Sequence, residues 1–308
     1  MAADNFVRSY GDNSKKEDVV LNAVEILTAK ETMIFNMLGK TRAIDTVHHY
    51  LTDSLKAAAA NAQKEGDDYS YLARTTPSRL SNVVQHIHVP FVVSDTQRNV
   101  EHYHGRDELD RQTEKALMEF ANDAEFNLVR STLTSGASGT APAMSGIIEA
   151  ISKSTNTTAH TSGTVWDATI LDGLVKDNYE NSNGDLATDL FMGSYLRSAT
   201  DGFTQKSNIV VNNPGGISTI VRTVSTYQTA FSTLNIHTHR YVQQSGDATG
   251  RVLAVRPEKL KVAFLENPNI DTDVARTGPA TKRAVKASMT LEVRNQDSNF
   301  FASGLNIG

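Results

Sequence analysis

Cysteine is absent from the 308-residue sequence, which excludes disulfide bonds, thiolate nucleophiles and cysteine metal ligands. No apolar run approaches the roughly 20 residues that a membrane-spanning helix needs, so we expect no membrane partner. The first ten residues are polar and lack the apolar core of a signal peptide. These absences predict a protein that is made and used in a cytoplasm-like compartment.

An excess of positive charge is also missing. The sequence has 30 lysines and arginines against 35 aspartates and glutamates, a formal net charge of −5. Proteins that read nucleic-acid sequence usually carry a basic surface, so sequence-specific binding gains no support. Aromatic residues make up only 7%, with one tryptophan, which favours hydrogen-bonded loops and extended edges over a compact aromatic enzyme core. The chain is long enough to bury a large core and to hold two domains.

The sequence motifs of several enzyme classes are missing as well. There is no Gly-x-Ser-x-Gly elbow, no phosphate-binding loop ending in Gly-Lys-Ser/Thr and no Gly-x-Gly-x-x-Gly fingerprint. The glycine-rich segment 212–216 lacks a lysine and the spacing of a phosphate cradle, so a turn is the simpler interpretation. The carboxylates are spread over predicted helix surfaces. We therefore expect no enzyme activity, no catalytic residues and no cofactor.

Three His-x-His pairs are the one pattern that could hold a metal ion. Residues two apart share a face of a strand, so each pair could present two imidazoles. A catalytic zinc site needs a third ligand and an ordered second shell, and no residue at a telling spacing supplies one. Polar-face histidines are the simpler interpretation, and a metal-dependent hydrolase is kept as the less favoured alternative. The pairs are His86/His88, His102/His104 and His237/His239.

The segment 105–136 predicts the longest helix of the chain, because it has no proline and no internal glycine. Carboxylates fill its first turn, and Gly136 stands where a C-terminal stop belongs. A helix of about 28 residues would be roughly 42 Å long. Two offset apolar stripes predict that it is covered on more than one side. The first stripe comprises Leu109, Ala116, Leu117, Phe120, Ala124 and Leu128, and the second Met118, Phe126, Val129 and Leu133.

Residues 44–94 predict an out-and-back β-ribbon, because apolar and polar residues alternate on both sides of a long polar tip. A lone two-stranded ribbon is marginal in water, so it needs a neighbour, which another copy of the chain could provide. The tip could be a solvated loop, but complementary charge across a subunit boundary would fix register and orientation. The candidate residues for contact between subunits are Glu65, Asp67, Asp68, Arg74 and Arg79.

After residue 145 the sequence alternates between predicted helices and strands, which suggests a compact α/β unit over 146–255. Within it, the Ser/Thr/Asn-rich segment 152–164 is predicted to be an exposed loop. The tail returns to strand periodicity, and 285–293 is the clearest half-buried strand, with the long helix as its natural partner. Within 146–255 we predict helices at 167–179 and 195–203, and strands at 190–192, 217–225, 234–242 and 251–255.

This order of parts resembles that of the major capsid protein of tailed phages, which has the HK97-like fold. Residues 65–68 (Glu-Gly-Asp-Asp) with 76–85 are similar to the ribbon tip and return of one phage major-head-protein family. Residues 189–194 resemble its central strand-to-helix turn, and 276–296 its last long strand. The resemblance implies an α+β fold. Its parts would be an N-terminal arm (1–43), the E-loop ribbon (44–96), the P-domain with its spine helix (97–145), the A-domain (146–255) and returning P-domain strands with the C-terminus (256–308).

The resemblance also implies a function. The chain would assemble with itself into hexamers and pentamers of an icosahedral phage head that encloses double-stranded DNA, retaining it by closure and not by sequence-specific binding. Portal, scaffolding and decoration proteins would be further partners, with scaffolding supplied by a separate protein or a removed segment. The chain would assemble in the host cytoplasm and reside in the virion capsid. An encapsulin-like compartment or a tail subunit is the alternative.

Overall fold

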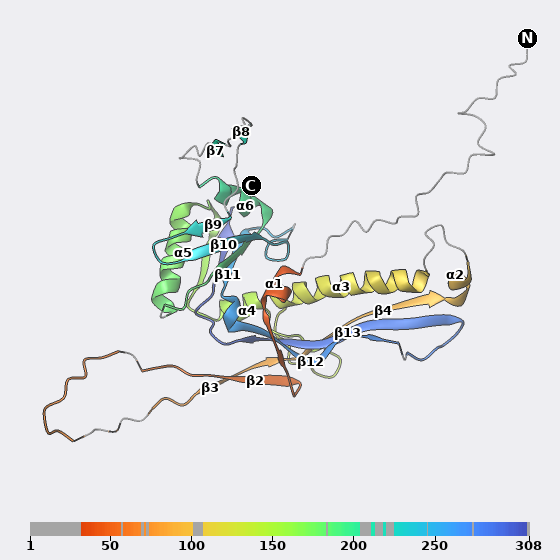
Figure 1. The fold of residues 1–308 in the computed structure, drawn as a ribbon, viewed down its shortest axis with the longest axis horizontal. Coiled ribbons are helices and arrows are strands. Elements are labelled where there is room, and N and C mark those ends of the chain that lie inside the picture. The colour runs from red at the N-terminus through yellow and green to blue at the C-terminus, as the bar shows by residue number, and fades with distance from the viewer. Residues whose placement is uncertain are drawn as a thin grey trace, which may run out of the picture.

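The computed structural model describes residues 32–56, 58–68, 71, 74–100, 107–182, 184–203, 211–212, 218–219, 225–244, 246–272 and 274–306. Most of the predicted N-terminal arm, the His102/His104 pair and most of the turn at 212–216 lie outside the described residues. Figure 1 shows two packed bodies, each built on one sheet, and a ribbon that projects from their junction. The described helices do not include one that is both long and apolar enough to cross a membrane.

The first body is a four-stranded sheet with the spine helix α3 (Glu108–Arg130) on one face. Its strand order is β1-β12-β13-β4, in which β1 runs parallel to β12 and the other pairs are antiparallel. The apolar stripe of α3 and the alternate apolar residues of β13 share one core, which confirms the predicted partnership. These strands are β1 (Gly39–Arg42), β12 (Leu260–Asp271), β13 (Ala280–Val293) and β4 (Gln85–Ser94).

Helix α3 is 23 residues long and therefore shorter than predicted. It begins as expected, because the Asp107 carboxylate accepts the Leu109 N–H at 3.0 Å and caps the first turn. It ends at Arg130, well before Gly136, because the returning chain packs against its last turn. The Gly146 N–H donates to the Ser131 carbonyl at 2.8 Å, an approach so close that a side chain at Gly146 would strike the backbone of α3.

The described residues cover only one side of α3, so the predicted cover on a second side is missing within this part of the chain. Five of the six residues of the first stripe are buried, but Leu117 is 43% exposed. In the second stripe, Val129 is buried, while Phe126 and Leu133 are exposed.

Strand β13 was predicted to be half-buried, with its polar face exposed, but part of that polar face is buried. Ser288, Thr290 and Glu292 are buried together with the apolar residues between them, so the strand's C-terminal half is covered on both faces. The second cover is the base of the ribbon, where the Asn82 side chain donates to the Leu291 carbonyl at 2.8 Å. Period-two alternation predicts two faces, but it cannot predict that a distant segment closes over the polar one.

The ribbon itself is shorter than predicted. Strands β2 (Val47–Thr52) and β3 (Ser78–Val83) pair antiparallel in the predicted out-and-back arrangement. The predicted return to residue 94 is wrong, because residues 85–94 form β4 and pair with β13 in the first sheet. A single buried residue, Val84, separates β3 from β4, so the chain passes directly from the ribbon into the body.

The second body is a six-stranded sheet with helices packed against it, in the strand order β5-β14-β11-β6-β10-β9. Helix α5 (Ala168–Asn181) begins after the Asp167 cap, as predicted, and β6 (Asp189–Met192) is the predicted buried strand. Two predictions are wrong here. Residues 157–164 form the edge strand β5, and the C-terminal strand β14 (Phe300–Leu305) belongs to this sheet and not to the first.

The remaining elements complete these two bodies. The second sheet also contains β9 (Thr226–Gln228), β10 (Thr233–Thr238) and β11 (Gly250–Val255). Four further helical segments are α1 (Met33–Met37), α2 (Asp95–Asn99), α4 (Ile147–Ser152) and α6 (Ser194–Asp201), with a 3-10 turn at Pro257–Lys259. A small hairpin pairs β7 (Val211–Asn212) with β8 (Ser218–Thr219).

Gly304 provides a test of this second sheet. Its φ of +85° is in the left-handed region, and a Cβ there would overlap the carbonyl oxygen of His160 in β5. Gly66 has nearly the same φ, +82°, but a Cβ at Gly66 would meet no atom within 4 Å. We expect Gly66→Ala to cost roughly 1–2 kcal/mol of backbone strain at most. Gly304→Ala should lower the free energy of unfolding in urea by clearly more, and equal losses would contradict the β5–β14 packing.

Candidate functional site

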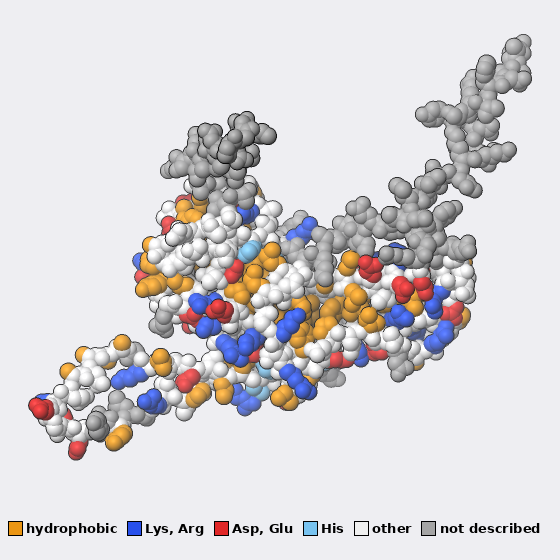
Figure 2. Space-filling model, viewed as in Figure 1, with side chains coloured by type: hydrophobic (Ala, Val, Ile, Leu, Met, Phe, Trp, Pro, Cys, Tyr) orange, Lys and Arg blue, Asp and Glu red, His pale blue; other side chains and the backbone are white. Residues whose placement is uncertain are grey.

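The five charged residues predicted for subunit contact all lie on the projecting ribbon and are exposed. Glu65, Asp67 and Asp68 lie at the apex, where Figure 2 shows acidic side chains at the far end of the molecule. Arg74 and Arg79 lie on the returning side. Among the described residues, none of the five has an opposite charge within ion-pairing distance. The structure therefore places these residues on one element, and the described part of the chain supplies no partner for their charges.

Apolar side chains on the same ribbon are also uncovered. Leu55 is 98% exposed and Tyr71 is 93% exposed, and Leu51 also faces solvent. Burying such side chains is worth roughly 1.5–3 kcal/mol each, so leaving them in water is a cost that a partner would remove. The ribbon thus combines unpaired charge with exposed apolar surface, which is typical of an interaction surface.

The base of the ribbon, in contrast, is firmly held. The Asn82 amide donates to the carbonyls of Ser145 and Leu291 at 3.1 and 2.8 Å, and its oxygen accepts the N–H groups of Ser145 and Val83, both at 2.9 Å. The Val84 N–H donates to the Thr46 carbonyl at 2.8 Å. This bond joins the two chain segments that connect the ribbon to the body, one just before β2 and one just after β3. With every hydrogen-bonding group of the buried amide satisfied, the base is fixed in orientation.

A buried carboxylate adds to this anchorage. Glu292 of β13 lies 3.4 Å from His48 Nε2 of β2, and Arg294 Nε donates to it at 2.6 Å. Burial raises the pKa of the nearby Tyr50 hydroxyl, and the negative charge of Glu292 raises it further against an opposing backbone hydrogen bond at Val293. The ribbon is therefore a projection with a rigid base and an uncovered apex.

A second buried carboxylate, Glu125 of the spine helix, joins three elements. Glu125 and His239 are both 0% exposed, and His239 Nε2 lies 2.9 Å from Glu125 Oε1. The Glu125 carboxylate also accepts the N–H groups of Ile34 and Phe35 in α1, at 2.7 and 2.8 Å. The Tyr241 N–H donates to His239 Nδ1 at 3.2 Å, so the imidazole carries its proton on Nε2 and donates it to Glu125.

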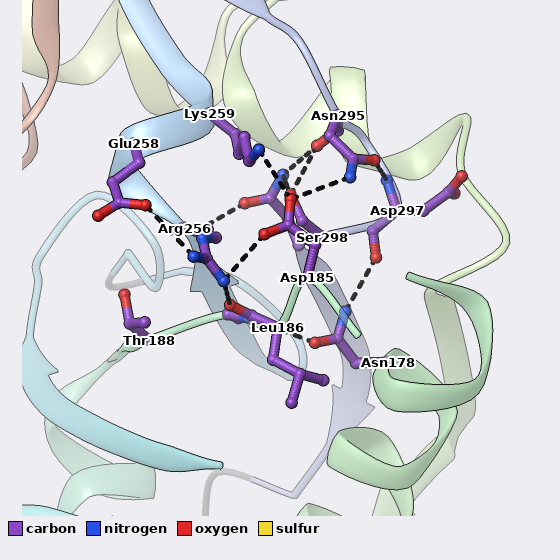
Figure 3. A network of polar contacts seen from close by, with 12 residues as sticks. Asn178, Asp185, Leu186, Thr188, Arg256, Glu258, Lys259, Asn295, Asp297 and Ser298 are labelled. Carbon is purple, nitrogen blue, oxygen red and sulfur yellow. Dashed lines mark hydrogen bonds and ion pairs between the residues drawn. The ribbon is translucent and has the colours of Figure 1, made fainter. Parts of the chain in front are cut away.

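A third polar cluster lies between the two sheets, at their covalent links (Figure 3). Asp185, in the loop after α5, pairs with Arg256 Nη1 at 2.9 Å and with Lys259 Nζ at 3.1 Å. It also accepts from the Asn295 amide at 3.3 Å. Arg256 and Lys259 belong to the β11–β12 link, and Asn295 to the β13–β14 link. One carboxylate therefore holds both links, and the two sheets are braced against each other.

Sequence reasoning missed Glu125, His239 and Asp185 as organising residues. Glu125 looked like a solvated charge on a helix surface. The available signal was its place among Ala124, Leu128 and Val129, because a charge there falls within the buried side of the helix. No comparable signal marks Asp185, which lies in a polar loop.

The histidine pairs do not form a metal site among the described residues. His86 Nδ1 lies 2.7 Å from the Ser288 hydroxyl, while His88 is exposed. His237 pairs with Asp189 at 3.0 Å, and its sequence partner His239 pairs with Glu125. Within the described part of the chain, no group of three or more histidines and carboxylates is arranged to hold a metal ion. The hydrolase alternative has no geometric support there.

The chain matches the family model described as SU10 major capsid protein over residues 7–306. The capsid of the native GTA particle is similar in structure, with a TM-score of 0.65 and 10% identity over 97% of this chain and 98% of that one. Gordonia phage Cozz gives 0.61 and 12%, covering 97% and 94%. The holo-SrpI encapsulin of Synechococcus elongatus PCC 7942 gives 0.60 and 10%, covering 95% and 92%. Curated proteins gave no match.

A four-stranded sheet backed by a spine helix, a second six-stranded body and a projecting ribbon together make the HK97-like fold of capsid shell subunits. The match over residues 7–306 identifies the group within that class. The chain belongs to the SU10 major capsid protein family. It is a structural subunit of a virion capsid, and the predicted resemblance is confirmed.

The Glu125 contacts predict a large stability difference between two glutamates of one helix. Glu125→Ala leaves the α1 N–H groups and His239 without their acceptor, and breaking a buried pair in this way costs about 3–5 kcal/mol. Glu119→Ala removes only an exposed pair with Lys115 at 3.6 Å, worth under about 1 kcal/mol. Urea unfolding of the two variants measures the difference. Similar midpoints and slopes would contradict the role assigned to Glu125.

Proposed function

We propose that this chain is the major capsid protein of a tailed phage and forms hexamers and pentamers of an icosahedral head that encloses double-stranded DNA. The observation that carries the proposal is the ribbon, whose apex is uncovered although its base is fixed. A surface of this kind is completed only by another molecule. Since capsid subunits assemble with copies of themselves, a second copy of the chain is the natural partner for this surface.

The proposed mechanism is head-to-tail association that closes on itself. Each subunit presents a ribbon to one neighbour and receives a ribbon from the other, so the contact is heterologous and a ring forms when the rotation closes. In this arrangement, the body with the six-stranded sheet would lie toward the centre of the ring. The four-stranded sheet and spine helix would form the rim, where rings meet. Many modest interfaces acting together would stabilise the shell.

The contents and partners follow from the same proposal. A formal net charge of −5 suits a shell that retains DNA by closure and does not need to bind it tightly. Portal, scaffolding and decoration proteins are the proposed further partners, and the host cytoplasm is the proposed place of assembly. We assign the chain no catalytic role, because its buried carboxylates serve structural contacts.

An encapsulin-like compartment is the second candidate, favoured by the likeness to a holo-encapsulin structure. The two candidates differ in what the shell encloses. Electron microscopy of the expressed chain tests for closed shells, and nuclease-protected nucleic acid within particles from infected cells supports the phage head. Particles that enclose protein cargo and no nucleic acid would favour the compartment.

Charge reversal on the ribbon tests the assembly role. We expect Arg79→Glu and Glu65→Lys each to reduce particle yield several-fold, because like charges would then meet across the subunit boundary. The folded body should be unaffected, since neither side chain makes an ion pair within the described chain. Sedimentation measures the particles, and circular dichroism and thermal unfolding monitor the subunit.

The matched controls keep the charge and alter only the side-chain length. Arg79→Lys and Glu65→Asp should assemble close to normally if charge is what matters. Normal particle yield from both reversed variants would contradict the role of the ribbon in assembly.

A further inference from the structure

A hollow beside the edge strand β1 offers a receiving surface for a ribbon apex. It has a volume of about 400 Å³ and lies where β1 ends, beyond which β12 is paired only with β13. Its apolar wall is made by Phe35 and Phe264, whose rings pack edge to face with centroids 6.1 Å apart. Its lining residues are Phe35, Lys40, Thr41, Phe264, Asn267 and Pro268.

Positive charge borders this hollow. Lys40 Nζ lies 5.0 Å from the centre of the Phe35 ring, over its face. The parallel register pairs Lys40 with Val262 and Arg42 with Phe264, so both cations lie on the face of the sheet that carries Phe264. Both are exposed, and no carboxylate of the described chain pairs with either one. The lining contains no acidic residue, and the nearby Glu266 carboxylate is already paired with Lys286 at 3.3 Å.

The ribbon apex has the complementary composition. Glu65, Asp67 and Asp68 bring three carboxylates against the single Lys64 amine at the turn, so the apex is acidic. Tyr71 is 93% exposed and follows Asp68 by three residues, so its Cα lies within about 11 Å of the Asp68 Cα. An apolar ring beside acidic groups matches an apolar hollow with a basic border.

The apex of the same subunit does not occupy this hollow. Figure 1 shows the ribbon pointing away from the body, with β12 crossing near the ribbon base and the apex at the far end. The contacts of Asn82 and Glu292 fix that direction. A ribbon apex in this hollow must therefore come from a second copy.

We propose that the ribbon apex of one subunit docks in the β1 hollow of its neighbour. Its carboxylates pair with Lys40 and Arg42, and the Tyr71 ring packs against Phe35 and Phe264. This inference rests on the proposed function, since it names the receiving surface for the ribbon. Paired charges set register, and the buried tyrosine acts as the anchor.

The absence of cysteine makes a direct test possible. In the variant Lys40→Cys/Asp67→Cys, mild oxidation of assembled particles should link most subunits into covalent chains on a non-reducing gel. The control Lys176→Cys/Asp67→Cys places the first cysteine on the exposed surface of α5 and should give mainly monomers. Particles that form normally but crosslink no more than the control would overturn this docking while leaving the shell function standing. Failure of the unsubstituted chain to form particles would instead count against the proposed function.

A charge swap gives an independent readout. Glu65→Lys and Lys40→Glu should each lower particle yield several-fold, and the two together should recover a substantial part of it. No recovery in the double variant would contradict the pairing. The basic border could instead bind nucleic acid. In that case Lys40→Glu/Arg42→Glu would reduce the enclosed nucleic acid with unchanged particle yield, and the docking proposal would fail.

Discussion

The arrangement of the subunit depends on the hydrogen bonds that the buried Glu125 carboxylate accepts. A charge removed from water must be met by donors, and Glu125 finds them in two backbone N–H groups of α1 and in His239. These donors come from α1, which precedes the ribbon, and from the segment that follows β10 of the second sheet. Hydrogen bonds to one side chain therefore hold three parts of the chain together. Asp185 braces the two sheets at their covalent links in the same way.

This bracing explains how a subunit can be both well defined and incomplete. The apolar core and the polar clusters around Glu125 and Asp185 stabilise the body, and Asn82 fixes the base of the ribbon. The apex nevertheless leaves charged and apolar side chains exposed to water. A rigid body presents that surface in one orientation, which reduces the ordering cost of association. Under the proposed function, identical copies with a fixed heterologous contact would then close into rings.

Local sequence patterns determined much of this architecture. The Asp167 cap and the apolar spacing after it specified α5, the short apolar run specified β6, and the alternation of 285–293 specified β13 and its helix partner. Charge at the tip of a predicted ribbon marked the element that we propose for contact between subunits. These features were predictable because helix caps, period and turn residues act over a few neighbouring positions. The quoted motifs also identified the capsid class, which the family match confirms.

The tertiary structure alone decided which surfaces meet. Residues 85–94 were predicted to belong to the ribbon, but their pairing with β13 places them in the first body. The polar segment 157–164 forms a strand because it pairs with β14. Helix α3 ends at Arg130 because the chain at Gly146 packs against its last turn. Burial of Glu125 depends on partners 90 or more residues away in sequence. The sequence by itself determined the kinds of elements and the class of protein, whereas strand partners and buried charges depend on long-range contacts that no local pattern encodes.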